Sequence, residues 1–296
     1  MGTLPGKDPG MDIGKPENYR AAAKAAGDAF LAAGVPEASL QAVRLMCHVA
    51  GMTPAMWLVR REERISDAEW DEFAALAKRR LSREPLQYIL GEQEFMGLPF
   101  TVTPDVLIPR QDTEHAVTEA LAWCDGKKVL DMCTGSGCIA VSIAKLGKPA
   151  SVDAADISRA ALSVASANAM RNGVNVRFLE SDMFEKITDV YDVIISNPPY
   201  IPPEQLRELE PEVKDYEPRL ALYGGEDGLD YYRVLVAEGA KHLQPARNGE
   251  TGGILIVEIG YDQGISVPAL FREAGYAGVT VKKDYAGLDR VVIGHL

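Results

Sequence analysis

The sequence predicts an α/β protein built on a mostly parallel sheet, with a small helical domain at the N-terminus. The first observation is a helical pattern that runs from Asn18 to about Arg83. The second is a change at Lys127, after which short apolar runs rich in β-branched residues alternate with helical stretches. This alternation indicates parallel pairing, because each helix carries the chain back across the sheet. The third is that several apolar runs end in Gly, Asp or Asn, as strands do at the ligand-binding edge of such a sheet.

Residues 1–84 form the predicted helical domain, and we expect about the first 17 residues, which are rich in Gly and Pro, to be disordered. An alanine-dense helix is interrupted at Gly34, and a second helix follows over 39–49. Ser66 and Glu69 have the spacing of a capping box and mark the start of a further helix. Two roles fit such a domain: it grips a partner or shields the site, or it is a stabilising appendage.

Pro85 marks a boundary in the chain. Residues 85–108 alternate short apolar pieces with Gly and Pro, which predicts a hairpin linker. Residues 109–296 then form the larger domain. Its expected strands are 129–131, 151–155, 174–180, 190–196 and 253–259, its expected helices are 113–123, 139–146, 158–172, 229–243 and 267–274, and a hairpin of 279–283 with 290–294 closes it.

The composition of the 296-residue chain is that of an ordinary globular protein, with 47% hydrophobic and 25% charged residues. A formal net charge of −12 disfavours a protein that binds nucleic acid by neutralising phosphates. There is no apolar run long enough to span a membrane and no signal peptide, so we expect a cytoplasmic protein. The few scattered cysteines argue against a disulfide framework. Cys133 and Cys138 lack further metal ligands nearby, which favours small core residues over a zinc site.

A glycine-containing loop follows the strand 129–131 and leads into the next helix. Glycines at these positions let the backbone approach a ligand closely, and the helix N-terminus offers free N–H groups. The loop matches only the relaxed form of the dinucleotide fingerprint, which is a weak signal by itself. The candidate cofactor-binding residues here are Asp131, Cys133, Thr134, Gly135, Ser136 and Gly137.

The ends of the following strands strengthen this prediction. Asp156, with Ile157 beside it, lies about 20 residues beyond the loop, where an acidic side chain accepts ribose hydroxyls. Asp182 and Met183 follow the next strand and offer a carboxylate and an apolar surface for an adenine. Asn197 follows the fourth strand. Because carboxyl ends of parallel strands meet at one edge, we expect a single crevice rather than four unrelated caps and turns.

Asn197, Pro198, Pro199 and Tyr200 form the stretch around which the rest of the chain is organised. The two prolines end the strand and remove two backbone donors. What remains is a rigid patch of acceptors, the Asn197 amide oxygen and backbone carbonyls, beside an aromatic ring. Such a patch suits a planar group that carries an NH2, which fits both a glutamine amide and the amine of adenine. The alternative is a plain proline turn after a core strand.

The block Leu-Ile-Pro-Arg-Gln-Asp-Thr-Glu occupies residues 107–114. Thr113 or Asp112 is placed to cap the helix that follows, which puts Arg110 and Glu114 on either side of its N-terminus. A purely structural cap is the alternative to a functional role for this block.

These motifs together resemble those of the class I S-adenosylmethionine-dependent methyltransferases, which have a Rossmann-like sheet. The 107–114 block, the stretch Glu-Pro-Leu-Gln-Tyr-Ile-Leu-Gly at 84–91 and the stretch 284–290 are similar to those of the HemK/PrmC family. The resemblance covers nearly the whole chain from the helical domain onward. Asn-Pro-Pro-Tyr is shared with amino-methylating DNA enzymes, so the 107–114 block is the more specific marker.

The resemblance implies an enzyme with S-adenosyl-L-methionine as cofactor that methylates the glutamine side-chain nitrogen of the Gly-Gly-Gln motif in peptide chain release factors. It implies catalytic roles for Asn197, Pro198 and Tyr200, with Pro199 contacting the substrate. We place Arg110 and Glu114 at the rim of the site, where Glu114 either meets the donor's amino group or is a helix N-terminal charge.

Two residues depart from the family pattern: Gln111 replaces a proline, and Cys133 replaces the first glycine of the loop. Cys133 must therefore carry a side chain where the family has none. Neither change removes a side chain that the chemistry needs.

Other functions share part of this pattern. A glutamine methyltransferase of a ribosomal protein is close kin, and an adenine or cytosine amino-methyltransferase uses the same catalytic loop. The acidic composition and the lack of a second large domain count against a nucleic-acid substrate. A cofactor-binding regulator without turnover would have no need of the acceptor patch.

Overall fold

The computed structural model describes residues 14–246 and 251–296, so most of the N-terminal segment predicted to be disordered lies outside the described residues. The chain divides into two compact units. One unit runs to Gly91 and also takes in Pro211–Tyr216, and the other comprises Glu92–Glu210 and Glu217–Leu296. The predicted boundary at residue 84 is therefore too early, and no pattern in the sequence indicated that a later segment joins the helical unit.

The helical unit is a bundle around its own apolar core, which confirms the helical pattern predicted for this region. Ser66 caps its helix as expected: its hydroxyl accepts the Glu69 N–H, and the Glu69 carboxylate accepts the Ser66 N–H at 2.9 Å. The helices are α1 (Tyr19–Ala32), α2 (Ala38–Val49), α3 (Pro54–Arg60), α4 (Asp67–Leu81) and α5 (Leu86–Leu90).

An ion-pair cluster fixes the segment Pro211–Tyr216, which includes α10 (Pro211–Lys214), within the helical unit. Arg80, which is 1% exposed, donates to the Glu212 carboxylate at 2.6 Å. Arg83 donates to both oxygens of the same carboxylate, at 2.7 and 2.6 Å. The Tyr216 hydroxyl donates to the Ser82 carbonyl at 2.6 Å. A partly buried carboxylate shared by two guanidinium groups is costly to break, because removing one partner leaves the other charge buried and unpaired.

The larger unit contains a seven-stranded sheet with the order β5-β4-β3-β6-β7-β9-β8. The five strands from β5 to β7 pair in parallel, and β9 joins β7 and β8 antiparallel. This confirms the mostly parallel sheet and the closing hairpin. The strands are β3 (Lys128–Met132), β4 (Ser151–Asp156), β5 (Arg177–Glu180), β6 (Val193–Ser196), β7 (Ile254–Glu258), β8 (Ala277–Lys283) and β9 (Asp289–His295).

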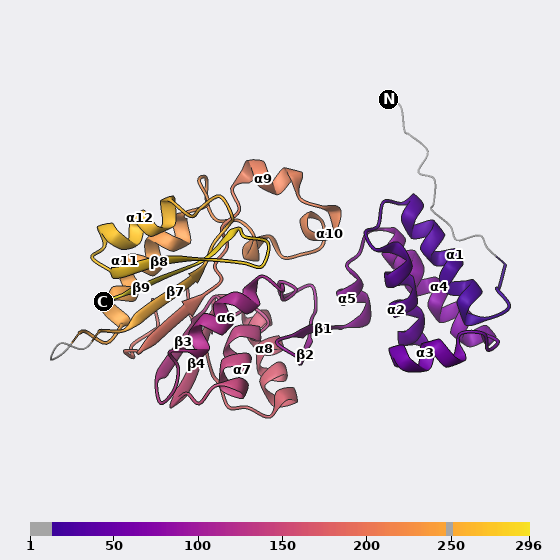
Figure 1. Cartoon of the computed structure of the whole chain (residues 1–296), viewed down its shortest axis with the longest axis horizontal. Coiled ribbons are helices and arrows are strands. Elements are labelled where there is room, and N and C mark those ends of the chain that lie inside the picture. Colours follow the sequence, from indigo (N-terminus) through magenta and orange to yellow (C-terminus); the bar gives the residue numbers. More distant parts are fainter. Residues whose placement is uncertain (1–13, 247–250) are drawn as a thin grey trace. The chain divides into compact units, whose positions relative to one another are not determined.

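Helices cover both faces of the sheet (Figure 1) and bury a separate apolar cluster on each face. One cluster packs α6 (Thr113–Leu121), α7 (Cys138–Leu146) and α8 (Arg159–Asn172). The other packs α11 (Asp230–His242) and α12 (Ser266–Glu273). Because β6 and β7 are covered on both sides, all their residues are buried, which explains their continuous apolar sequences. The short elements α9 (Pro203–Glu208) and η1 (Arg219–Ala221) between β6 and α11 were not predicted.

The predicted linker hairpin exists but is shorter and belongs to the larger unit. Strands β1 (Glu92–Phe95) and β2 (Leu98–Thr101) pair antiparallel. The Asn168 side chain on α8 accepts the Thr101 N–H at 2.7 Å and donates to the Thr101 carbonyl at 3.0 Å. The preceding residues 86–90 are helical. These bonds make the hairpin part of the sheet's own scaffold rather than a free connection.

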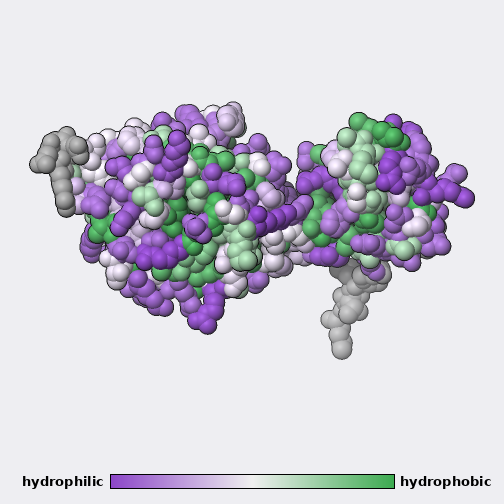
Figure 2. Space-filling model, turned by 90° about the horizontal axis from the view of Figure 1, so that it is seen from below, coloured by the Kyte–Doolittle hydropathy of each residue, from purple (hydrophilic) through white to green (hydrophobic). Residues whose placement is uncertain are grey.

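The face drawn in Figure 2 is largely hydrophilic: purple side chains are spread over it, with smaller green, hydrophobic areas between them. In the part of the chain that the structure describes, no single helix has the length and apolarity to cross a membrane, although the bent pair α2 and α3 passes that test on length and composition alone.

Candidate active site

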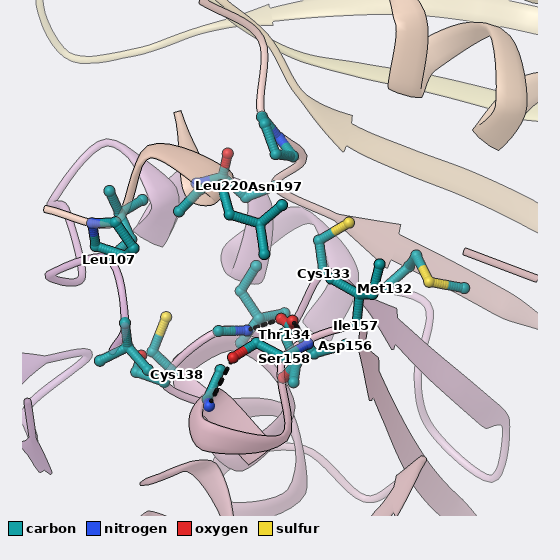
Figure 3. A pocket seen from close by; sticks show the side chains of 18 of the residues that line it. Leu107, Met132, Cys133, Thr134, Cys138, Asp156, Ile157, Ser158, Asn197 and Leu220 are labelled. Atoms are coloured by element: carbon teal, nitrogen blue, oxygen red, sulfur yellow. Dashed lines mark hydrogen bonds between the residues drawn. The ribbon is translucent and has the colours of Figure 1, made fainter. Parts of the chain in front are cut away.

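A pocket opens at the carboxyl ends of the parallel strands, within the larger unit. The loops after β3, β4, β5 and β6 all contribute to its lining, as expected for strands that end at one edge. Figure 3 shows Asn197 and Leu220 across the pocket from Asp156 and Ser158. Of the residues predicted from the sequence, the pocket is lined by Cys133, Thr134, Gly135, Ser136, Asp156, Ile157, Asp182, Met183, Asn197, Pro199 and Arg110.

Asp131 lies beneath the loop after β3 instead of lining the pocket. Its side chain is fully buried, and one oxygen accepts the Thr134 hydroxyl at 2.6 Å and the Ala140 N–H at 3.1 Å. The other oxygen, Oδ1, is buried without a partner among the described residues. Burial raises the pKa of this carboxyl to about 7. The Asp131 carboxyl group thus links the loop after β3 to the start of α7 and holds the loop in place without lining the pocket.

The two glycines of this loop have different roles. Gly135 has a φ of +54° and lines the pocket, and a Cβ built on it would meet no atom within 4 Å. Gly137 also has a positive φ, of +79°, but its Cβ would lie 2.9 Å from that of Ala165 on α8. Gly137 therefore lets α7 and α8 approach each other. Only Gly135 has open space beside it for a ligand, because α8 fills the space beside Gly137.

Asp156 lies at the end of β4 with its carboxylate fixed by the backbone. One oxygen accepts the Gly135 N–H and the other accepts the Ser158 N–H, both at 2.9 Å. Burial raises the pKa of this carboxyl, and these two bonds oppose the shift. Because each carboxylate oxygen has a second lone pair, Asp156 keeps acceptors for a ligand in the pocket.

Two sulfur atoms form part of the wall between the strand ends. The Cys133 and Met183 sulfurs lie 3.9 Å apart, and both residues have positive φ, 62° and 44°. Burial and the neighbouring Asp156 raise the pKa of the Cys133 thiol well above its ordinary value, so the thiol stays protonated. The Cys133 side chain is thus accommodated as an apolar part of the pocket wall.

Asn197 is half-buried and lines the pocket directly after β6. Its Nδ2 donates to the Thr113 hydroxyl at 3.1 Å, which leaves Oδ1 free of that contact. Pro198 and Tyr200 do not line the pocket, and Tyr200 packs against the apolar cluster under α11. Burial raises the pKa of the Tyr200 hydroxyl, which keeps it neutral.

A second glycine loop supports the Asn-Pro-Pro-Tyr turn, and sequence reasoning missed it. A Cβ on Gly224 would lie 2.5 Å from the Tyr200 Cα, and a Cβ on Gly228 would lie 2.4 Å from the Tyr200 carbonyl oxygen. The Gln263 amide donates to both the Tyr200 and the Gly228 carbonyl groups, at 3.3 and 3.1 Å. The run Gly-Gly-Glu-Asp-Gly at 224–228 was the available signal, since glycines are required where two backbones touch.

Each charged residue of the 107–114 block is held by a different partner. Arg110 lines the pocket and forms an ion pair with the buried Glu217. Asp112 occupies the N-cap position of α6, as predicted, but its side chain makes no capping hydrogen bond and pairs with Arg290 at 3.2 Å. Glu114 lies in the first turn of α6, outside the pocket lining.

The Glu114 carboxylate accepts the Met96 N–H at 2.6 Å and so fixes the β1–β2 turn. This geometry favours the structural alternative for Glu114 over contact with a ligand.

Residues after the Asn-Pro-Pro-Tyr turn also line the pocket, and the sequence did not indicate them. Pro218, Leu220 and Ala221 come from η1 and its approach, and Tyr231 comes from the start of α11. Leu220 and Ile157 are 51% and 48% exposed, which is high for large apolar side chains on a pocket wall. Apolar side chains left open to a pocket favour binding of an apolar ring.

Comparisons with known proteins identify the family. Residues 21–91 match the PrmC N-terminal domain, and residues 113–209 match the methyltransferase small domain. The release factor glutamine methyltransferase of Geobacter sulfurreducens is 43% identical over 265 residues, which cover 89% of this chain and 91% of that protein. The enzyme of the same name from Moorella thermoacetica is 44% identical over 271 residues, covering 89% and 93%. The chain belongs to the release factor glutamine methyltransferase family.

Membership of this family confirms the resemblance predicted from the 107–114 block and the Asn-Pro-Pro-Tyr turn. A methyltransferase from Pyrococcus furiosus has a similar fold, with a TM-score of 0.52 and 21% identity over 68% of this chain and 90% of that chain. This likeness confirms the predicted methyltransferase fold class.

The pocket fits S-adenosylmethionine, the methyl donor expected for this family. The Asp156 carboxylate with free lone pairs suits a ribose, and the half-exposed Ile157 and Leu220 side chains suit the faces of an adenine ring. Gly135 leaves room beside the backbone for the rest of the donor. The residues present therefore match the chemistry of the cofactor.

Proposed function

We propose that this chain transfers a methyl group from S-adenosyl-L-methionine to the side-chain amide nitrogen of a glutamine in a peptide chain release factor. The target is the glutamine of the Gly-Gly-Gln motif, and the reaction takes place in the cytoplasm, where translation occurs. The observation that supports this most is that the half-buried Asn197 amide lines a pocket suited to the donor.

The donor supplies an already activated methyl group, so the residues of the pocket mainly position and shield it. Asp156 would hold the ribose hydroxyls, and Asp182 with Met183 would contact the adenine; all three residues line the pocket. Thr134, Gly135 and Ser136, from the loop after β3, would contact the rest of the donor. Arg110 lies at the rim, where its pair with Glu217 limits its movement.

The acceptor is the harder reactant, because the lone pair of an amide nitrogen is delocalised into its carbonyl group. Asn197 Oδ1 and the Pro198 carbonyl each accept one N–H of the glutamine amide. These bonds fix the nitrogen and oppose the positive charge that grows on it as the methyl arrives. A strong general base is not required, because the proton becomes acidic only after the transfer.

An assay with labelled donor tests this function. The purified chain is incubated with release factor, ribosomal protein or DNA, and label is measured on each. We expect label on the release factor only, at the glutamine nitrogen. Label on ribosomal protein alone would assign the chain to its close kin, label on DNA would make it a nucleic-acid amino-methyltransferase, and no label would leave a binding module.

Asn197→Ala tests the catalytic assignment. Removing one preorganised hydrogen-bonding group costs roughly 10²–10³ in rate, so we expect a fall of that size in turnover. Donor binding is measured on the same variant by titration, which separates loss of cofactor from loss of chemistry. Turnover close to that of the wild type would reject the role of Asn197.

A further inference from the structure

The orientation of the Asn197 side chain decides whether the site works. An asparagine can point either its oxygen or its NH2 group at a ligand, and only the oxygen accepts N–H bonds from a substrate amide. In the structure Nδ2 donates to Thr113 Oγ1 at 3.1 Å. The Thr113 hydroxyl can serve as this acceptor only while its own proton is directed elsewhere.

A buried carboxyl group is placed to take that proton. Glu258 is the last residue of β7, and its interaction with the Thr113 side chain lowers the pKa of its carboxyl group, against the larger effect of burial. The register of β6 and β7 pairs Ser196 with Val257, so Asn197 and Glu258 are the next residues on adjacent strands. Thr113 and Glu258 are each 2% exposed, so water does not compete for these bonds.

Glu258 is not accounted for by the rest of the fold. Its Oε2 is buried without a hydrogen-bond partner among the described residues, although burying such a group is costly. A carboxyl group in so unfavourable a place requires an explanation other than packing. Its place beside Asn197 in the strand register, and its interaction with the Thr113 side chain that accepts from Asn197, supply one.

We propose that Thr113 and Glu258 are positioning residues that hold the Asn197 amide with Oδ1 turned toward the substrate nitrogen. The orientation of the Asn197 amide follows from the chemistry of the Glu258 carboxyl group, the Thr113 hydroxyl and the amide itself. In its ionised form the Glu258 carboxylate only accepts, so the Thr113 hydroxyl donates to it. The lone pair of the hydroxyl then faces Asn197, and only the NH2 group can bind there. This inference rests on the proposed function. It gives a role to Thr113, which the sequence analysis treated as a possible helix cap, and to Glu258, which the sequence analysis did not consider.

Thr113→Val tests the relay because valine has nearly the shape of threonine but lacks the hydroxyl. Without the acceptor the amide is free to turn, and we expect kcat to fall about 10-fold to 100-fold, as when a residue that orients a reactive group is lost. The KM for release factor and the Kd for donor should change much less. Thr113→Ser keeps the hydroxyl and should restore most of the activity.

Thr118→Val is the matched control, since it is the same substitution on the exposed side of α6. We expect wild-type kinetics from it. Wild-type kcat in a folded Thr113→Val protein would overturn the relay.

Glu258→Met provides a second variant that does not depend on how Thr113→Val folds. It replaces a buried carboxyl group by an apolar side chain of similar length, so folding is not expected to suffer. The Thr113 proton is then free to bond to Asn197 Oδ1 and turn the amide the wrong way, which should lower kcat about 10-fold or more.

The double variant Thr113→Val with Glu258→Met separates a relay from two independent effects. If both residues act through Asn197, the double variant should lose no more than the more damaging single change, whereas independent effects would multiply. Multiplied losses would overturn the relay.

Failure of the relay can be distinguished from failure of the proposed function. If Asn197→Ala is inactive while Thr113→Val and Glu258→Met retain wild-type kcat, the function stands and the relay is wrong. If the wild-type chain methylates none of the substrates, the function itself is wrong.

Discussion

Single residues at the pocket adopt backbone conformations that their side chains do not favour. Cys133 and Met183 both have positive φ, which costs a non-glycine residue on the order of 1–3 kcal/mol. Both residues line the pocket, and their sulfur atoms are in contact. Strain of this kind persists where the surrounding structure fixes the backbone. Position 133, where the family has glycine, therefore carries a cysteine at a cost in backbone strain, which the packing of the site offsets.

Gly224 is a position at which one added methyl group should disturb the active site. The Cβ of Gly224→Ala would lie 2.5 Å from the Tyr200 Cα and 2.9 Å from the Pro199 carbonyl oxygen. Backbone atoms cannot move aside as a flexible side chain can, so the Asn-Pro-Pro-Tyr turn must shift. A misplacement of about 1 Å costs on the order of 10²-fold in rate, and we expect a loss of that size in methyl transfer.

The control for this change is Gly14→Ala, because a Cβ on Gly14 meets no atom within 4 Å. Circular dichroism should show both variants folded, and donor titration should show that the pocket of Gly224→Ala still binds. Normal turnover by Gly224→Ala would mean that the turn tolerates displacement.

At the scale of elements, a glycine inside a helix is useful only where another element touches it. Gly239 lies in α11, and its Cβ would meet Tyr276, Phe184 and other atoms at ordinary contact distances of 3.5–3.8 Å. Alanine also loses less backbone entropy than glycine on folding. We therefore expect Gly239→Ala to raise the free energy of unfolding by about 0.5–1 kcal/mol, measured by urea denaturation.

Gly27 in α1 provides the opposite case. Its Cβ would lie 3.2 Å from the Ser39 Cα on α2, closer than ordinary contact, so the two helices would have to separate. Gly27→Ala should lower the free energy of unfolding by about 1–3 kcal/mol despite the better helix propensity of alanine. Equal effects of the two substitutions would show that helix propensity, rather than packing, decides the outcome.

At the scale of the whole molecule, buried carboxyl groups make stability depend on pH. Burial raises the pKa of both Asp131 and Glu258 to about 7, from ordinary values of 3.8 and 4.5. At pH values between the ordinary pKa and the raised pKa, these carboxyl groups keep their protons in the folded chain and have lost them in the unfolded chain. Stability from these groups is therefore complete below about pH 4 and falls as the pH rises to 7, by at most about 1.4 kcal/mol per pH unit for each group.

Asp131→Asn tests this dependence, because asparagine does not titrate. The free energy of unfolding is measured for both proteins at about pH 5 and about pH 7. We expect the wild type to lose stability relative to the variant as the pH rises. Carboxylates whose pKa values are lowered by basic partners, such as Asp227 beside Arg233, change their contribution below pH 4 and do not affect this window. A difference that stays constant with pH would show that Asp131 is ionised throughout.

The sequence by itself determined the sheet and the residues at its strand ends. Asp156, Asp182 and Asn197 reach one pocket because each lies at the end of a strand or within two residues of it, and parallel strands end at a common edge. That convergence depends only on local patterns: the strand, its direction and the next residue. Their assignments to donor and substrate remain predictions.

Only the tertiary structure decided what holds those residues in place. Thr113 bonds to Asn197 across 84 residues, and Arg110 pairs with Glu217 across 107. Gly224 and Glu258 gain their roles because the order of strands β6 and β7 and the packing of the 224–228 loop place them against the catalytic turn. Contacts between distant segments depend on how the elements pack, and no periodicity or spacing within the sequence records that packing.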